Sequence, residues 1–404
     1  MKGMNIGLKE ALSLTIRAIK PLPAEDVSLV DSIDRTAALD LNALVDSPSL
    51  DASSKDGYAV LSHDVAHATV EKPVRLRLLG SIEAGCESNI QIKPGTTARI
   101  LTGARIPTGA DAVVAEEFVK QGDKDIFVEI FAEPGRNILP HGKDVSLNKC
   151  ILRSGQQISP GMAGFIAAAG HSMVPVFRNP VVGIIGTGDE IVEPGKPLSE
   201  GKLYASNIVT LAGWCSKYKM KTRMRIVRDD YDAILKELKM LSEGTDAIIT
   251  SGGAWTGDRD MVAQVLEGLG WKEMFHRIRI GPGKAVGFGI LDEKPVFILP
   301  GGPTSNLMGF LQIALPGLLA LSGHSSPGLQ RINARLGSDL RGRELDWTNF
   351  FFGILEYEKG LPTFFPIKKR SRLSSIADAK AVAAIPEGEE YISKGSIISV
   401  QLLS

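Results

Sequence analysis

The residues best suited to chemistry lie in one stretch, 246–260, which reads DAIITSGGAWTGDRD. Gly252 and Gly253 allow positive φ angles and close backbone approach, so several N–H groups can point at one anion. Asp258 and Asp260 follow; either carboxylate could cap a helix over 260–269, and both are hard oxygen ligands for a divalent cation. Taken alone, the stretch is equally compatible with an ordinary turn between a strand and a helix.

Two other stretches repeat this plan of an apolar strand followed by a glycine corner. Residues 181–190 read VVGIIGTGDE and end on an acid pair, and residues 295–306 read PVFILPGGPTSN. Backbone N–H groups and hydroxyls at such corners, with Lys284 in a GPGK turn, suit phosphate groups. Glu190 and Asp260 are predicted to hold Mg²⁺ between the protein and a phosphate.

The elements between these corners predict a parallel α/β sheet. The apolar run 247–249 is too short for a helix and suits a strand covered on both faces. Helical spacing occurs at 207–218 and 231–241, with an apolar run ending at Val227 between them. In such a sheet ligands collect at the carboxyl ends of the strands, where all three corners would meet. This convergence favours a binding site over three unrelated turns.

The rest of the chain predicts further domains, since 404 residues exceed a single core. Residues 8–19 have the spacing of an amphipathic helix, interpreted as a packing or dimerisation helix. Short β-prone runs between Val27 and Leu152 predict a separate, mainly β domain, and similar runs after Gly323 predict a small β-barrel or sandwich. Within the latter, IKKRSRLSS at 367–375 fits either a solvated charged loop or an oxyanion contact.

Composition excludes several classes of function. The 46 basic and 46 acidic residues cancel, so no global field favours nucleic acid or membrane as a partner. Three cysteines and six histidines are scattered, so spacing yields neither a zinc ligand set nor a Ser-His-Asp triad. The longest apolar run, 307–321, falls short of the ~20 residues of a membrane span. We expect a soluble, cytoplasmic protein.

Along nearly its whole length the chain resembles the molybdopterin molybdenumtransferase family, the MoeA and gephyrin E-domain proteins. Matching pieces include DGYAV at 56–60, GTTARILTGARIPTGADAVVAEE at 95–117, GKDV at 142–145 and LPGGPTSN at 299–306, besides 246–260. Each piece is weak alone, but their order is specific.

The resemblance implies an α/β multidomain fold and a homodimer. A central three-layer α/β/α molybdopterin-binding lobe would join a mainly β domain, a helical linker domain and a C-terminal β-barrel. The active cleft would lie between the lobe of one subunit and the β domain of its mate. The implied boundaries are 1–26 with 153–178 for the linker domain, 27–152 for the mainly β domain, 179–325 for the lobe and 326–404 for the barrel.

The implied reaction is insertion of molybdate into adenylylated molybdopterin with Mg²⁺, which releases AMP and molybdenum cofactor. A MogA-like adenylyltransferase is an implied partner. The acidic set expected to act is Asp56, Asp144, Glu190, Asp258 and Asp260, with Glu190 and Asp260 as the metal ligands. The residues expected to contact the pterin, the nucleotide or the oxyanion are Thr102, Gly103, Thr187, Gly188, Asp246, Ser251, Gly252, Gly253, Lys284, Gly301, Pro303, Ser305 and Ser371.

The chain departs from the family pattern at the oxyanion pocket. Gly281 stands where the family has a lysine, and the arginine expected within 346–353 is a phenylalanine. Each charge-assisted hydrogen bond lost there is worth roughly 1.5–3 kcal/mol. Our hypothesis is that Arg370 and Arg372, which flank Ser371, replace the missing charges.

Two alternatives follow from these departures. A divergent paralogue would bind a pterin or nucleotide, or act as a dimeric scaffold, without inserting metal; the substitutions at Gly281 and Ala285 favour it. A phosphoanhydride hydrolase on the same lobe would release AMP without molybdate. The intact GTGDE and SGGAWTGDRD stretches favour the transferase.

Overall fold

The computed structural model describes residues 6–252, 261–357, 360–367 and 371–403. The chain divides into two compact units, residues 26–175 and residues 1–25 with 176–404. The predicted residues Gly253, Asp258 and Asp260 lie outside the described residues, as does Arg370.

The unit of residues 26–175 is built mainly of strands, as predicted. Its largest sheet has the order β7-β4-β6-β5-β9-β8, in which only β5 and β6 run parallel. The helix α2 begins after Ser159, whose hydroxyl accepts from Met162 N across 3.1 Å. The strands of this sheet are β4 (Gly57–Val60), β5 (Val74–Ile82), β6 (Thr96–Ile100), β7 (Ala112–Ala115), β8 (Val119–Gln121) and β9 (Asp125–Val128); α2 spans Pro160–Ala168.

Shorter pairs join β2 (Leu41–Asn42) with β11 (Cys150–Leu152), and β3 (Ala52–Ser53) with β10 (Ile138–Leu139). A further pair joins β1 (Ala24–Ser28) with β12 (Met173–Phe177).

The second unit contains the predicted α/β lobe. Its sheet has the order β16-β13-β17-β21-β20-β18. The first four strands are parallel, and β20 and β18 add antiparallel pairings at one side. The central strand β17 is buried along its whole length, as its apolar run predicted. The strands are β13 (Val181–Thr187), β16 (Lys221–Val227), β17 (Ala247–Ser251), β18 (Lys272–His276), β20 (Gly287–Leu291) and β21 (Lys294–Leu299).

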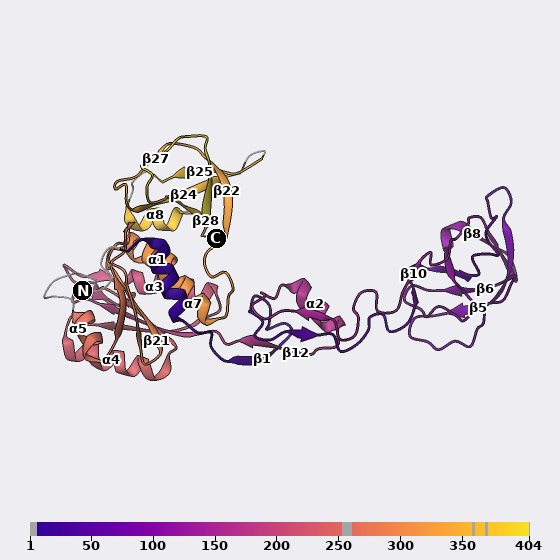
Figure 1. Ribbon diagram of the computed structural model, residues 1–404, viewed down its shortest axis with the longest axis horizontal. Coiled ribbons are helices and arrows are strands. Elements are labelled where there is room, and N and C mark those ends of the chain that lie inside the picture. Colours follow the sequence, from indigo (N-terminus) through magenta and orange to yellow (C-terminus); the bar gives the residue numbers. More distant parts are fainter. Residues whose placement is uncertain (1–5, 253–260, 358–359, 368–370, 404) are drawn as a thin grey trace. The chain divides into compact units, whose positions relative to one another are not determined.

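Helices cover both faces of this sheet and make three layers (Figure 1). On one face α4 (Tyr231–Gly244) and α5 (Met261–Gly268) pack against β17 and β21. On the other face lie α3 (Ser206–Lys217), α1 (Leu8–Ala18) and the helix that contains α6 (Pro303–Gly309) and α7 (Leu315–Leu321). The family resemblance groups residues 1–26 with 153–178 in a linker domain; in the structure α1 packs its apolar face against the lobe, where Ala11 is fully buried.

The helix Pro303–Leu321 is long and apolar enough to cross a membrane by length and composition, yet 89% of its apolar window is buried inside the protein. Its apolar residues belong to the core that joins α1, α3 and the sheet. It is therefore a core helix of the lobe.

The C-terminal region forms a closed barrel, as predicted. Strands pair in the order β24-β25-β22-β28-β26, and the pairing of β26 with β24 closes the ring. The short α8 (Arg372–Asp378) begins at Ser371, whose hydroxyl accepts from Ser374 N. The barrel strands are β22 (Arg331–Leu336), β24 (Thr348–Glu356), β25 (Thr363–Pro366), β26 (Ala381–Ile385) and β28 (Ile397–Leu402), with β19 (Ile280–Gly281) added beside β24 and a separate pair of β23 (Leu340–Arg341) with β27 (Tyr391–Ile392).

Candidate functional site

The connections of the lobe create a crevice between β13 and β17. From β13 the chain passes through α3 to β16 on one side, then returns through α4 to β17 on the other side. Ligands bind at such a reversal, outside the carboxyl ends of the strands. The register places Gly186 beside Ser251, and Ser251 beside Leu299. The three predicted glycine corners therefore meet at this edge.

Two asparagines tie the corners together. The buried Asn306 amide donates to Ser251 Oγ across 3.0 Å and to Pro300 O across 2.9 Å. From the first turn of α3, Asn207 Nδ2 donates to Gly301 O across 2.8 Å. Neither asparagine was assigned a role from sequence. The available signal was a Ser-Asn pair in the first turn of both α3 and α6.

Gly252 occupies a position that only glycine fits. Its φ is +107°, and a Cβ there would lie 2.5 Å from Thr187 O. The Thr187 hydroxyl is buried and finds no hydrogen-bond partner among the described residues. A buried polar atom without a partner is costly, and Thr187 is also among the residues that line the cavity at these corners.

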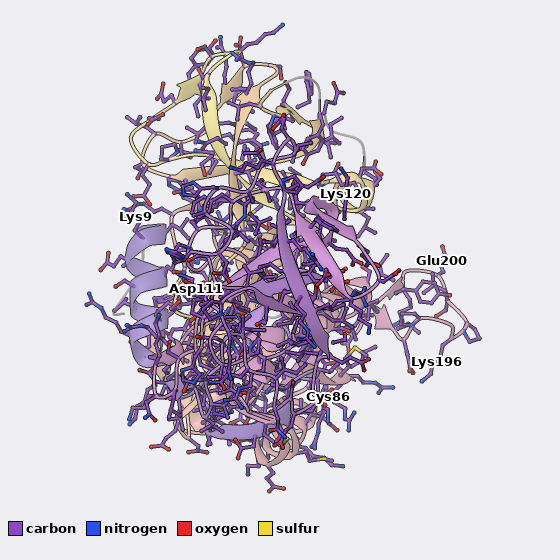
Figure 2. The ribbon with its side chains drawn as sticks, turned by 90° about the vertical axis from the view of Figure 1, so that its right-hand side faces the viewer. Lys9, Cys86, Asp111, Lys120, Lys196 and Glu200 are labelled. Atoms are coloured by element: carbon purple, nitrogen blue, oxygen red, sulfur yellow. The ribbon has the colours of Figure 1, made fainter. Side chains whose placement is uncertain are left out.

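A cavity of about 660 Å³ opens at these corners, within the size range of small-molecule sites. One wall is a flap that runs from β14 (Ile191–Val192) to β15 (Leu203–Tyr204). Figure 2 shows Lys196 and Glu200 on this flap, which projects from the lobe. Other lining residues come from the corners, the flap and α8, namely Thr187, Glu190, Leu198, Asn207, Ser251, Gly252, Gly301, Pro303, Ser371, Arg372 and Leu373.

Acidic side chains gather beside the first corner. Burial raises the pKa of Asp229, and the nearby charges of Glu190 and Asp189 raise it further. Its neighbour Asp230 caps α4, where its carboxylate accepts from Ala233 N across 2.9 Å. Asp229 was not predicted, although the acid pair directly after β16 was a signal for it. In the described part of the chain no three His, Cys, Asp or Glu side chains are arranged to hold a metal ion.

Comparison with known proteins identifies the family. Sequence models for the MoeA N-terminal region (domain I and II), a probable molybdopterin binding domain and the MoeA C-terminal region (domain IV) match residues 6–170, 183–320 and 333–403. A molybdopterin molybdenumtransferase of Bacillus subtilis is 31% identical over 98% of this chain and 94% of its own length. The chain belongs to the MoeA family.

Further relatives agree with the MoeA assignment. A molybdopterin molybdenumtransferase of Nostoc sp. is 30% identical over 93% of this chain and 88% of its own length. The crystal structure of the molybdopterin biosynthesis MoeA protein from Pyrococcus horikoshii is 31% identical, with a TM-score of 0.81 and 99% of both chains covered.

Some predicted residues of this MoeA-family chain do not line the cavity. Gly188 borders a neighbouring cavity of about 780 Å³, and neither Lys284 nor Ser305 lines either space. Ser371 lines the main cavity, but its hydroxyl already caps α8.

Asp246 lies at the start of β17, at the opposite end of the strand from Ser251 and Gly252. Arg178 donates to both of its carboxylate oxygens, across 2.6 and 2.8 Å, and Val181 N donates across 2.8 Å. Burial raises the pKa of this carboxyl, but the hydrogen bonds from Arg178 and Val181 outweigh that effect and lower it overall. This placement corrects the grouping of Asp246 with the corners, and we leave it out of the proposed ligand contacts.

In the unit of residues 26–175 the structure brings Asp56 and Thr102 together. Asp56 Oδ1 accepts from both Thr102 N and Thr102 Oγ1, each across 2.7 Å. The backbone hydrogen bond from Thr102 is the main cause of a lowered Asp56 pKa. Gly103 follows with a φ of +80°, and Asp144 is an exposed residue of a different loop.

Proposed function

We propose that this chain is a molybdopterin molybdenumtransferase, which inserts molybdate into adenylylated molybdopterin and releases AMP. The observation that carries the proposal is the meeting of three glycine corners around a cavity lined by Thr187, whose hydroxyl has no hydrogen-bond partner among the described residues. The names of the curated relatives support the same activity. No residue suited to covalent catalysis is required, because positioning and charge neutralisation suffice for phosphoryl chemistry.

In this proposal the corners bind the phosphate oxygens of the substrate. Thr187 Oγ1 donates one hydrogen bond, and the backbone at Gly252 allows close approach without a Cβ. Asn207 and Asn306 hold the corners at fixed spacing through Gly301 and Ser251. The apolar residues Leu198 and Leu373 offer a surface for the flat pterin ring.

We propose that acidic residues at the first corner supply part of a Mg²⁺ site. Burial and then the charges of Glu190 and Asp189 raise the pKa of Asp229, and a divalent cation would relieve the repulsion between these carboxylates. We assign Glu190 and Asp229 to the ion, with Asp260 as the predicted further ligand. When bound, Mg²⁺ supplies neutralisation of the charge that develops on the phosphate.

Molybdate is a substrate and needs cationic contacts. Arg372 lines the cavity, whereas Lys284 does not. We therefore propose Arg372 as a molybdate contact in place of the lysine that the family carries at position 281. A cationic side chain can form charge-assisted hydrogen bonds with an oxyanion.

The proposal includes a cytoplasmic homodimer. Asp56, Thr102 and Asp144 belong to the unit of residues 26–175, and the family resemblance places this unit in the cleft of the mate. The paired Asp56 and Thr102 are the residues on which we expect such a cleft to depend. A MogA-like adenylyltransferase would deliver the adenylylated substrate.

One assay tests the function against both alternatives. Purified protein with adenylylated molybdopterin and Mg²⁺ is given molybdate or none, and AMP release is followed together with reconstitution of a cofactor-free molybdoenzyme. We expect AMP release that depends on molybdate and yields reconstitution. Release that is indifferent to molybdate would show a hydrolase, and binding without release would show a carrier or scaffold.

A further inference from the structure

The core that joins the C-terminal barrel to the lobe is almost entirely apolar. Phe350 and Phe352 of β24 and Val382 of β26 belong to the same buried cluster as Met308 and Leu311 of the core helix. Apolar contacts are not directional, so they tolerate sliding or rotation of one packed surface on another. A directional contact is therefore needed to select one arrangement of the barrel on the core helix.

Within this apolar core two glutamine side chains form a reciprocal pair. Gln312 Nε2 donates to Gln401 Oε1 across 2.7 Å, and Gln401 Nε2 donates to Gln312 Oε1 across 3.2 Å. Only 4% of Gln312 and 7% of Gln401 is exposed. A slide of one partner would break both bonds and leave buried amide groups unsatisfied, which is costly.

The surrounding backbone is shaped for this contact. Gln312 lies in a π-helical segment, Phe310–Ala314, between α6 and α7. Such a segment rotates the following residues relative to a regular α-helix, and it commonly marks functional positions. Gln401 lies on β28, which pairs with both β22 and β26 of the barrel. The pair therefore joins the centre of the core helix to the frame of the barrel.

Both ends of this connection reach the candidate site. The core helix begins at Pro303, which lines the cavity next to Gly301. The barrel carries α8, whose residues Ser371 and Arg372 line the same cavity. Any change in how the barrel sits on the helix would move Arg372 relative to the corners.

We propose that the Gln312–Gln401 pair is a positioning device that fixes the barrel on the lobe in one register and thereby places Arg372 at the cavity. The inference rests on the proposed function for its kinetic consequence, but its structural consequence is independent of that function. The two glutamines contact neither the cavity nor a substrate, so they act through α8.

The decisive variant replaces both glutamines by leucine, which removes the directional contact and leaves no unpaired amide. We expect Gln312→Leu/Gln401→Leu to fold, with a KM for molybdate at least fivefold higher and a Kd for adenylylated molybdopterin within twofold of wild type. Gln312→Leu alone leaves the buried Gln401 amide without its hydrogen-bond partner, so it should lower Tm more than the double change does. If the double leucine variant does not fold, Gln312→Met/Gln401→Met supplies the same test with side chains that adapt to gaps. Leu311→Met is the matched control, because it alters the same helix and keeps both amides.

A distance measurement tests the register without any activity. Spin labels are placed at Met240 on α4 and Ile397 on β28, which are 51% and 60% exposed. The exposed Cys86 and Cys150 are replaced by serine, whereas burial raises the pKa of Cys215 to about 12 and keeps it unlabelled.

We expect one narrow distance distribution for the wild-type pair and for Leu311→Met, and at least twice that width for the double variant. A wild-type distribution that is already broad, or a double variant as narrow as wild type, would overturn the inference. The distance distributions test the inference even if the wild-type protein inserts no molybdate. That failure would refute the proposed function and leave the inference about the glutamine pair standing.

Discussion

Asn306 donates to Ser251 Oγ across 3.0 Å, although the two residues are 55 positions apart in the chain. The hydrogen bond joins the first turn of α6 to the end of β17, so two glycine corners form one surface. Asn306 is buried, and its amide also donates to Pro300 O across 2.9 Å, which satisfies a backbone carbonyl at this bend. The site is therefore held by side chains that need not touch the substrate themselves.

The corner at Gly252 should not tolerate a side chain. We expect Gly252→Ala to cost about 2 kcal/mol or more, because it combines a positive φ with a Cβ 2.5 Å from Thr187 O. Urea unfolding and AMP release measure stability and activity, and both should fall. Gly302→Ala is the matched control, since its Cβ would meet nothing within 4 Å. Equal behaviour of the two variants would contradict the proposed geometry.

The acids at the first corner should make the lobe less stable as pH rises when no cation is present. The folded pKa of Asp229 is raised, so its contribution to stability is fully present below the unfolded value of 3.8 and is lost as pH rises through the folded pKa. At pH 7.5 without divalent cations, Asp229→Asn should therefore raise Tm by about 1–3 °C. The same variant should gain less than wild type from added Mg²⁺. Differential scanning calorimetry with and without Mg²⁺ checks both statements, and a lower Tm in the variant would refute the first.

The carboxylate of Asp56 should stay ionised well into acid. Its folded pKa lies below the ordinary value of 3.8 because Thr102 donates two hydrogen bonds to it. A lowered pKa contributes stability above the unfolded value and loses it as pH falls through the folded pKa, so neutral pH leaves this contact intact. Thr102→Val removes the hydroxyl bond and keeps the N–H, so it should move the pKa upward. Carbon-13 NMR of the carboxyl group measures it, and a wild-type midpoint above 3.8 would disprove the expectation.

Asp246 should matter for stability and not for ligand binding. Asp246→Asn leaves Arg178 without its charge partner, and the loss should be about 1–2 kcal/mol after allowance for the partial exposure of Arg178. The affinity for adenylylated molybdopterin should remain within twofold of wild type. Denaturant unfolding measures the free energy of unfolding, and equilibrium binding measures the affinity. Weaker binding at unchanged stability would restore Asp246 to the site.

The parallel α/β sheet could be predicted from the sequence because the pattern of each strand agrees with its place in the sheet. Each strand that leads into a glycine corner is a buried apolar run, and parallel strands necessarily bring their carboxyl ends to one edge. The packing partner of α1 could not be predicted from its residues, because an amphipathic helix shows which face is buried but not which surface covers it.

The site was less predictable than the fold. Asp246 is six positions before Gly252 in sequence, but a strand rises about 3.3 Å per residue, which separates them by roughly 20 Å. The roles of Asn207 and Asn306 depend on side-chain direction across the sheet, which periodicity does not encode. Gln312 broke an apolar run in the sequence, and its partner Gln401 lies 89 positions away.

The measurement that tests the central claim most directly compares wild type with Glu190→Ala in one molybdate-dependent reconstitution. Both proteins are loaded with adenylylated molybdopterin and Mg²⁺, given molybdate, and assayed for AMP and for recovery of a cofactor-free molybdoenzyme. We predict stoichiometric AMP release with recovery for wild type, and at least a hundredfold slower release for Glu190→Ala with substrate still bound. Equal rates in the two proteins, or no recovery with wild type, would contradict the account.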